Sequence, residues 1–347
     1  MAIHPGESLA GYRVEHLLGR GGMGEVWSAR SFDGTRVVAI KVLLPKAAVN
    51  PELVARFERE ARAAAAIDSP YVCRLLGIER DRSGAHLLVF EQLEGETLSD
   101  RLKRELYLAF AEVGPLVDDV LQGLAAAHAA GVVHRDLKPG NIFIERLRVP
   151  APDGRHERAK VLDFGISKVS KKSKDGRRDE PSLTDFDATL GSFSYMAPEQ
   201  VRGAARADGR ADIYAVGTVV FRALAGRLPF EGPNAGTILA LKMDRPAPSL
   251  SEVTGEQWPA GLERFMACAL QRDRELRFAT ALDALAAWRS IQPEAIARRA
   301  GARARRPAPE DERSAVGYGV DASTEVDAPV WDGASTDVDG PDEGTKQ

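Results

Sequence analysis

Eight consecutive residues, His134-Arg-Asp-Leu-Lys-Pro-Gly-Asn141, carry the strongest chemical signal in this chain. They follow a segment apolar enough to be a core helix, so we expect them to form a loop at its end. In that loop Asp136 can orient an attacking hydroxyl and accept its proton, and Asn141 offers a carbonyl oxygen to Mg²⁺. Lys138 can neutralise charge that grows on a transferred phosphoryl group. The residue types and their spacing therefore predict a phosphoryl-transfer site.

Three further motifs follow in order. Asp163-Phe-Gly165 comes directly after an apolar strand, and a carboxylate in that position suits a hard cation that keeps part of its water shell. Ala197-Pro-Glu199 begins 34 residues after Asp163, and Asp212-Ile-Tyr-Ala-Val-Gly217 comes soon after. Each motif is weak alone, but their order strengthens the first interpretation.

A glycine-rich stretch, Gly19-Arg-Gly-Gly-Met-Gly24, lies near the N-terminus. Glycines let the backbone approach phosphates and point its amides at them. A dinucleotide-binding fold would continue directly into a helix, whereas here a strand-like stretch follows. A glycine-rich hairpin without a ligand is the alternative interpretation.

Lys41 breaks the pattern of the apolar strand Val38-Ala-Ile-Lys41, and an unpaired lysine is costly to bury. Glu60 similarly breaks the apolar stripe of a helix expected over 51–67, which Asn50 can cap. Two opposite charges that each interrupt an apolar pattern suggest one ion pair. A lysine on an edge strand facing water is the simpler alternative.

Taken in this order, the motifs resemble those of the eukaryotic-type (Hanks-type) protein kinase family, in particular its bacterial serine/threonine branch. The resemblance covers about residues 8–288. It implies an α+β bilobal kinase fold, with a small antiparallel β-sheet N-lobe carrying one main helix and a larger, mainly helical C-lobe. We therefore expect a serine/threonine protein kinase that transfers the γ-phosphate of Mg-ATP to protein hydroxyls, with Mn²⁺ as a substitute for Mg²⁺.

The resemblance also implies roles for individual residues. The catalytic residues would be Asp136 as the base, Lys138, Lys41 and Glu60, and the metal ligands Asn141 and Asp163. The nucleotide-binding residues would be Leu18, Gly19, Gly21, Gly24, Val26, Ala39, Lys41, Phe90, Glu91 and Leu93. Phe90 resembles the gatekeeper, and Glu91 and Leu93 resemble hinge residues that meet adenine through backbone groups. Structural roles are implied for Glu199 paired with Arg277, for Asp212 as a brace of the catalytic loop, and for His134 stacked with Phe164.

Patterning along the chain predicts its organisation. The domains we expect are a lead (1–11), the N-lobe (12–91), the C-lobe (92–290) and a disordered tail, first basic and then acidic (291–347). Strands are predicted over 12–18, 25–30, 36–43 and 86–91, short extended pieces over 141–145 and 160–162, and core helices over 115–130 and 211–225.

Composition limits the class of protein. The sequence contains no run of 18 apolar residues, no secretory signal and no histidine cluster, and Cys73 and Cys268 lie far apart. We expect a cytoplasmic, bacterial protein with protein substrates, without nucleic acid or a transmembrane segment. Residues 307–347 hold eleven acidic and two basic residues, a net charge of −9.

Several segments depart from the family pattern. Residues 146–158 form an insertion that we expect to be a surface hairpin, either a tolerated insertion or a docking element. The long segment 165–198 is basic at first and contains the phosphosite candidates Ser182, Thr184 and Thr189, where autophosphorylation is expected.

The tail contains a short repeat, Thr324-Glu-Val-Asp327 and Thr336-Asp-Val-Asp339. It resembles the phosphothreonine motifs read by FHA domains, so a bivalent docking tail is one hypothesis. An acidic solubilising tail is the alternative, and a tail that folds onto the basic segment and damps activity is another.

Two competing functions remain at this point. One is a non-catalytic scaffold with the same fold, which the presence of Lys41, Asp136, Asn141 and Asp163 disfavours. The other is a small-molecule kinase of related architecture, but such enzymes lack the Ala197-Pro-Glu199 platform.

Overall fold

The computed structural model describes residues 3–21, 24–43, 58, 61–81, 84, 86–164, 190–201 and 207–291. All of them belong to one compact unit, Met1–Ala302. Within these ranges no helix combines the length and the apolar character needed to cross a membrane.

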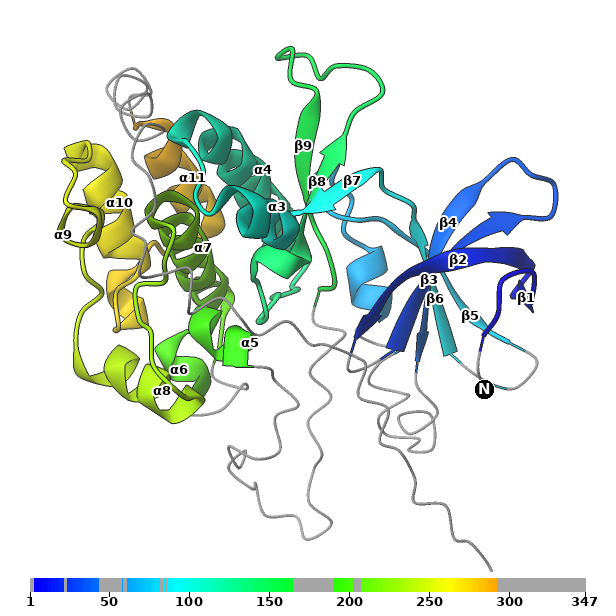
Figure 1. The fold of residues 1–347 in the computed structure, drawn as a ribbon, viewed down its shortest axis with the longest axis horizontal. Coiled ribbons are helices and arrows are strands. Elements are labelled where there is room, and N and C mark those ends of the chain that lie inside the picture. The colour runs from blue at the N-terminus through cyan, green and yellow to red at the C-terminus, as the bar shows by residue number, and fades with distance from the viewer. Residues whose placement is uncertain are drawn as a thin grey trace, which may run out of the picture. The chain divides into compact units, whose positions relative to one another are not determined.

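An antiparallel sheet opens the unit, with the strand order β1-β2-β3-β4-β6-β5 (Figure 1). The strands from β1 to β6 are Ser8–Leu9, Tyr12–Gly21, Gly24–Ser31, Val37–Leu43, Leu75–Arg80 and His86–Glu91. One face packs a core that includes Val14, Trp27, Ile40 and Val89. The four predicted strands are confirmed. The unpredicted β5 is an edge strand with half of its residues exposed and a register shift between Leu75 and Gly77.

The predicted helix over 51–67 is described only in part. Residues 58 and 61–65 are helical, and the helix ends before Ile67. Residues 51–57, 59 and Glu60 lie outside the described ranges. Ala61 is fully buried and packs with Leu75, Leu88 and Phe90 of β5 and β6.

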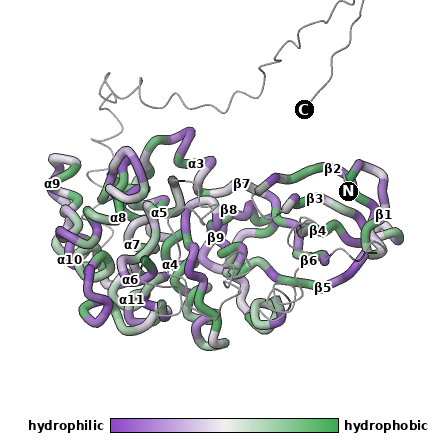
Figure 2. The backbone as a smooth tube through the Cα atoms, turned by 90° about the horizontal axis from the view of Figure 1, so that it is seen from below, coloured by the Kyte–Doolittle hydropathy of each residue, from purple (hydrophilic) through white to green (hydrophobic). Residues whose placement is uncertain are grey.

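The later part of the unit is mainly helical, as predicted. The helices are α3 (Leu98–Glu105), α4 (Phe110–Ala129), α5 (Leu190–Tyr195), α6 (Pro198–Val201), α7 (Gly209–Ala225), α8 (Ala235–Asp244), α9 (Leu250–Thr254), α10 (Ala260–Ala269) and α11 (Ala281–Arg289), with short 3-10 turns at Pro139–Asn141 and Arg274–Leu276. By contrast with the core helices, α3 is hydrophilic along most of its length (Figure 2), and only its Leu98 and Leu102 are buried.

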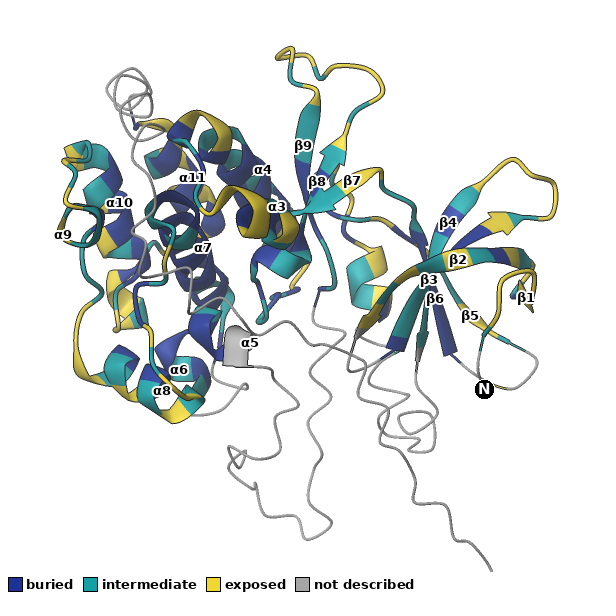
Figure 3. Cartoon of the chain, viewed as in Figure 1, coloured by how far each residue is buried: buried dark blue, intermediate teal, exposed yellow. Residues whose placement is uncertain are grey.

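Helix α7 is the centre of the helical core. It is buried along almost its whole length (Figure 3) and packs against α4 and α10. The Asp208 side chain caps its N-terminus by accepting a hydrogen bond from the Arg210 amide. Gly226 ends it with a φ of 77°, a left-handed conformation that favours glycine.

A second, three-stranded sheet has the order β7-β8-β9, from Gly95–Thr97, Ile142–Arg146 and Glu157–Val161. Strands β8 and β9 form an antiparallel hairpin whose register pairs Arg146 with Glu157. The hairpin continues past the strands, because the Leu147 amide donates to the His156 carbonyl at 2.8 Å. The expected surface hairpin over 146–158 is therefore confirmed.

Candidate active site

The loop between α4 and β8 brings the predicted base and its lysine together. Lys138 Nζ lies 3.0 Å from Asp136 Oδ2. Asn141 Nδ2 donates a hydrogen bond to the Asp136 carbonyl oxygen at 2.8 Å. An amide side chain has one donor and one acceptor end, so this contact orients Oδ1 of Asn141 as its ligand atom.

Asp212 holds this loop from the first turn of α7. Its carboxylate is buried and accepts hydrogen bonds from the main-chain amides of His134 at 2.9 Å and Arg135 at 2.7 Å. His128 Nε2 lies 2.8 Å from the same carboxylate. The bracing role implied by the resemblance is therefore confirmed by the contacts.

Two residues of the site have left-handed backbone conformations. Arg135 has a φ of 64° and Asp163 a φ of 52°. Such conformations cost about 1–3 kcal/mol in residues other than glycine and persist where surrounding contacts enforce them. For Arg135 that contact is the hydrogen bond to Asp212.

Asp163 is positioned by strand β9 and by the catalytic loop. The Val161 amide donates to the Tyr71 carbonyl at 2.9 Å, and the Cys73 amide donates to the Val161 carbonyl at 3.0 Å. One residue on, the Leu162 amide donates to the Asn141 carbonyl at 2.9 Å. These bonds link β9 both to the segment before β5 and to the catalytic loop.

Lys41 of β4 reaches across to Asp163, with Nζ 2.8 Å from Oδ1. Burial alone would raise the pKa of Asp163, but the charge and hydrogen bond of Lys41 outweigh it and lower that pKa. Glu60 lies outside the described residues, so its pairing with Lys41 stays a prediction. In the described part of the chain, Lys41 is paired with Asp163 across 122 residues of sequence.

The predicted stacking of His134 and Phe164 is also present. The ring centroids are 4.9 Å apart in an edge-to-face arrangement, and His134 Nε2 lies 2.8 Å from the Leu162 carbonyl oxygen. Phe164 is buried. The contact ties the catalytic loop to the residues on both sides of Asp163.

The donor set fits Mg²⁺ bound together with a nucleotide. Asp163 supplies a carboxylate and Asn141 an amide oxygen, from two segments joined by a main-chain hydrogen bond. Across the described ranges, no group of three or more histidine, cysteine or acidic side chains could hold a metal ion. Two protein ligands with the rest from water and phosphate are typical of Mg²⁺.

The predicted nucleotide-binding residues come mainly from the first sheet. Gly19 pairs with Val26 and Gly21 with Gly24 between β2 and β3. Val26 in turn faces Lys41, and Ala39 faces Phe90 across neighbouring strands. Leu18 is exposed and Leu93 half-buried. The sheet thus brings these positions together, and their contact with a nucleotide stays a prediction.

Glu91 has a further contact that sequence reasoning missed. Its carboxylate lies 2.7 Å from Lys160 Nζ on β9 and accepts a hydrogen bond from the Arg74 amide at 2.9 Å. Its own amide donates to the Arg74 carbonyl at 3.0 Å. The Glu91 carbonyl oxygen lies 3.9 Å from Cys73 Sγ. The contact of the Glu91 backbone with adenine stays a prediction.

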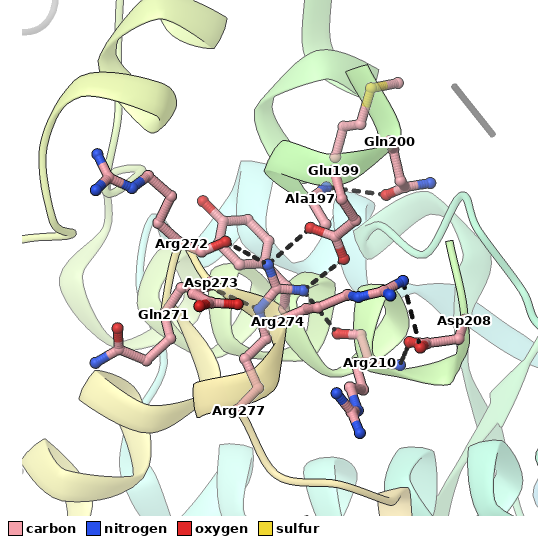
Figure 4. Close-up of polar contacts among 12 residues, drawn as sticks. Ala197, Glu199, Gln200, Asp208, Arg210, Gln271, Arg272, Asp273, Arg274 and Arg277 are labelled. Carbon is pink, nitrogen blue, oxygen red and sulfur yellow. Dashed lines mark hydrogen bonds and ion pairs between the residues drawn. The ribbon is translucent and has the colours of Figure 1, made fainter. Parts of the chain in front are cut away.

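The Ala197-Pro-Glu199 segment is held by a buried arginine (Figure 4). Arg277 donates two hydrogen bonds to the Glu199 carboxylate, at 2.7 and 2.8 Å, and others to the main-chain oxygens of Gln271, Arg272 and Arg210. The pair implied by the resemblance is therefore confirmed.

Gln200, which sequence reasoning also missed, links this segment to the catalytic loop. Its Oε1 accepts from the Ala197 amide at 2.9 Å, and its Nε2 donates to the Arg135 carbonyl at 2.8 Å. Its position directly after Glu199 was the only signal in the sequence. The bridge connects the segment after α5 to the residue before Asp136. The phosphosite candidates Ser182, Thr184 and Thr189, and the tail residues Thr324 and Thr336, lie outside the described residues.

Comparison with known proteins agrees with this geometry. The protein kinase domain family model matches residues 12–287. The chain is 38% identical over 271 residues to the serine/threonine-protein kinase pkn3 of Myxococcus xanthus, covering 78% of this chain and 48% of that protein. It is 34% identical over 255 residues to PknA of Mycobacterium tuberculosis, covering 72% of this chain and 55% of that protein. The chain thus spans about half the length of these curated relatives.

A solved structure shows the same fold. The crystal structure of the Mycobacterium tuberculosis PknI kinase domain matches with a TM-score of 0.62 and 26% identity, covering 83% of this chain and 99% of that chain. Given this fold, the assembled motifs and the match over residues 12–287, the chain belongs to the protein kinase domain family and is a homologue of bacterial serine/threonine-protein kinases.

Proposed function

We propose that this protein is an active serine/threonine protein kinase that transfers the γ-phosphate of Mg-ATP to hydroxyls of protein substrates. The observation that carries the proposal is a set of hydrogen bonds that join Lys138 and Asn141 to Asp136, and Asn141 to Leu162, the residue directly before Asp163. Lys41 meets the same group from β4. Family membership supports the use of ATP and a divalent metal.

The residues divide the reaction between them. Asp136 orients the substrate hydroxyl and takes its proton as the oxygen attacks the γ-phosphorus and the bond to the ADP oxygen breaks. Lys138, 3.0 Å from Asp136, is close enough to neutralise charge on the transferred group. Mg²⁺ bound by Asn141 and Asp163 would neutralise phosphate charge. Lys41 would hold the α- and β-phosphates.

Lys138 also supports serine and threonine, rather than tyrosine, as the residues that receive the phosphoryl group. The sequence Asp136-Leu-Lys-Pro-Gly-Asn141 is typical of serine/threonine kinases, and tyrosine kinases usually replace this lysine. The similarity to pkn3 and PknA, both named serine/threonine-protein kinases, supports the same assignment.

Transfer of labelled γ-phosphate to myelin basic protein tests the proposal. Lys41→Met and Asp136→Asn should each abolish transfer, while Lys103→Met, at a side chain 75% exposed on α3, should match the wild type. Transfer by Asp136→Asn at the wild-type rate would contradict the role of the base. A wild type that binds Mg-ATP in calorimetry but transfers nothing would favour the scaffold.

Autophosphorylation of the segment 165–198 is a separate part of the proposal. Arg135 precedes the base, and an arginine there can bind a phosphorylated residue through charge-assisted hydrogen bonds. Phosphopeptide mapping should find phosphate at Thr189 or Thr184, with Ser182 as a further candidate. Equal phosphate in the Asp136→Asn protein would show that the modification is not the kinase's own.

The tail repeat supports a partner with FHA domains. Thr324 and Thr336 each stand three residues before an aspartate, and two such sites on one tail would raise avidity. Tail peptides phosphorylated at both threonines should bind candidate FHA domains more tightly than unmodified peptides. Equal binding would refute the docking role.

A further inference from the structure

Lys242 is a lysine in the interior of the helical part. It lies on α8 among the buried residues Ile238 and Leu239 and is only 1% exposed. Its Nζ donates hydrogen bonds to three main-chain carbonyl oxygens: Phe193 at 3.0 Å, Ser194 at 2.7 Å and Met196 at 2.7 Å. An ammonium group has three protons, so it can serve each of these oxygens.

The three carbonyls belong to the segment Phe193–Met196, at the C-terminal end of α5. Carbonyl groups in the last turn of a helix lack partners within the helix, and a cation there is favourable. The side chain of Phe193 is itself buried with Met196 and Leu239. The segment is therefore fastened to α8 both by its side chains and by its backbone.

Tyr214 of α7 adds a second contact to the ammonium. Lys242 Nζ lies 5.2 Å from the centroid of the Tyr214 ring, and the guanidinium carbon of Arg277 lies 4.9 Å from the same centroid. Attraction between a cation and an aromatic ring is strongest where both are desolvated, and Tyr214 is 1% exposed. The same ring thus contacts the cations that hold the segments on both sides of Ala197.

A short series of hydrogen bonds connects this segment to the catalytic loop. Met196 is followed by Ala197, whose amide is bridged through Gln200 to the Arg135 carbonyl, one residue before Asp136. We propose that Lys242 is a positioning residue for the protein substrate: it holds Phe193–Met196, the segment joined through Ala197 and Gln200 to the catalytic loop, in the conformation that binds the substrate beside Asp136. This inference rests on the proposed kinase function.

The role of Lys242 should also depend on whether its amine is protonated. Burial lowers the pKa of Lys242 to about 7. A neutral amine has only two protons to donate, so at least one of the three carbonyls loses its hydrogen bond once Lys242 is deprotonated. The segment should therefore loosen, and bind substrate less well, as the pH rises above about 7.

Other groups near Lys242 do not account for such a change. The elements packed around it carry several charged or titratable groups: Tyr195 on α5, Glu199 on α6, Arg210, Asp212, Tyr214 and Arg222 on α7, and Asp244, which is exposed on α8 itself. Arg277 lies beside the ring of Tyr214. Burial raises the pKa of Tyr195 to about 12 and also raises that of Tyr214. Glu199 is ion-paired with Arg277. Among the groups on these elements, Lys242 is therefore the one expected to titrate near neutral pH.

Steady-state kinetics with Mg-ATP and myelin basic protein test the proposal. Lys242→Met should raise the KM for myelin basic protein about ten-fold, because charge-assisted hydrogen bonds that order the segment are lost. The KM for ATP should stay within about two-fold, since Lys242 contacts only the segment and Tyr214 among the described contacts. Lys103→Met, the exposed control, should behave as the wild type. An unchanged KM for myelin basic protein in a folded Lys242→Met protein would overturn the proposal.

A pH series keeps the proposal testable if Lys242→Met does not fold. For the wild type the KM for myelin basic protein should rise between about pH 7 and 9, whereas Lys242→Arg, which stays charged, should show a flat profile. A flat wild-type profile, or the same rise in Lys242→Arg, would overturn the role of Lys242. Absence of transfer by the wild type would instead overturn the proposed kinase function itself.

Discussion

Replacement of Arg155 by Met tests whether the β8–β9 hairpin is an integral part of the fold. Arg155 lies in the extended hairpin and donates two hydrogen bonds to Asp119 on α4, at 2.9 and 3.0 Å. The Asp119 side chain is 0% exposed and also accepts from the Ala159 amide at 2.9 Å. The variant would leave a buried carboxylate without its counter-charge.

The expected loss follows from the burial of the pair. Removal of one partner from a buried ion pair costs about 3–5 kcal/mol. The Arg155 side chain is 26% exposed, so in the variant water can partly take over its hydrogen bonds to Asp119. We therefore use the lower end of this energy range. We expect Arg155→Met to lower the free energy of unfolding by about 3 kcal/mol, roughly two powers of ten in the unfolding constant.

Urea denaturation followed by circular dichroism measures this loss. Arg148→Met is the matched control, because Arg148 lies in the same hairpin but is 83% exposed and paired with the exposed Glu94. No measurable change is expected there. Adding Asp119→Asn to Arg155→Met should recover part of the loss, since no charge is then buried. Equal stability of Arg155→Met and Arg148→Met would refute the reasoning.

The pH dependence of the loss has a definite sign. Burial raises the pKa of Asp119, and Arg155 and the Ala159 amide only partly offset this. A carboxyl group with a raised pKa in the folded state lowers stability as the pH rises from its unfolded to its folded pKa. Without Arg155 the folded pKa rises further, so the deficit of Arg155→Met should be larger at about pH 7 than at about pH 4.

Three further perturbations test the site. Asp212→Ala removes the acceptor of two catalytic-loop amides. The kcat should therefore fall at least about ten-fold, while the ATP affinity measured by calorimetry stays nearly unchanged. An unchanged kcat would contradict the bracing role. Glu199→Gln leaves Arg277, whose side chain is 0% exposed, without its anion, so urea denaturation should show a loss of about 3 kcal/mol, and a loss close to zero would count against it. Lys41→Met removes the charge that lowers the pKa of Asp163. A lowered carboxyl pKa stabilises the fold at pH values above the pKa of the unfolded state, and this contribution disappears as the pH falls through the folded pKa. The loss of unfolding free energy in Lys41→Met, measured by urea denaturation, should therefore be present at about pH 7 and shrink toward about pH 3. A loss that does not depend on pH would refute this origin.

Local patterns along the chain were sufficient to predict most of the secondary structure. The strands β2, β3, β4 and β6 and the helices α4 and α7 lie where apolar periodicity predicts them. The edge strand β5 was not predicted because half of its residues are exposed, only one is buried, and its register is interrupted. The chemistry of Asp136, Lys138 and Asn141 was equally accessible, because these residue types stand within six consecutive positions.

Contacts between distant segments were accessible only where the family resemblance supplied both partners. Glu199 with Arg277 was found in this way, although 78 residues separate them. Arg155 with Asp119, 36 residues apart, was not, because the insertion has no counterpart in the pattern. In the sequence, Arg155 is one charged residue in a polar loop. Its partner becomes visible only when β9 is packed against α4.

Lys242 marks the limit of sequence reasoning most clearly. Its hydrogen-bond partners are main-chain carbonyls 46 to 49 residues away. Every residue has a carbonyl group, so no side-chain type in the sequence can identify these three as acceptors. The sequence alone thus establishes the strands, the core helices and the catalytic motifs, because their signals are local. The packing of α8 against α5 makes Lys242 a buried cation, because only folding brings its amine and those carbonyls together.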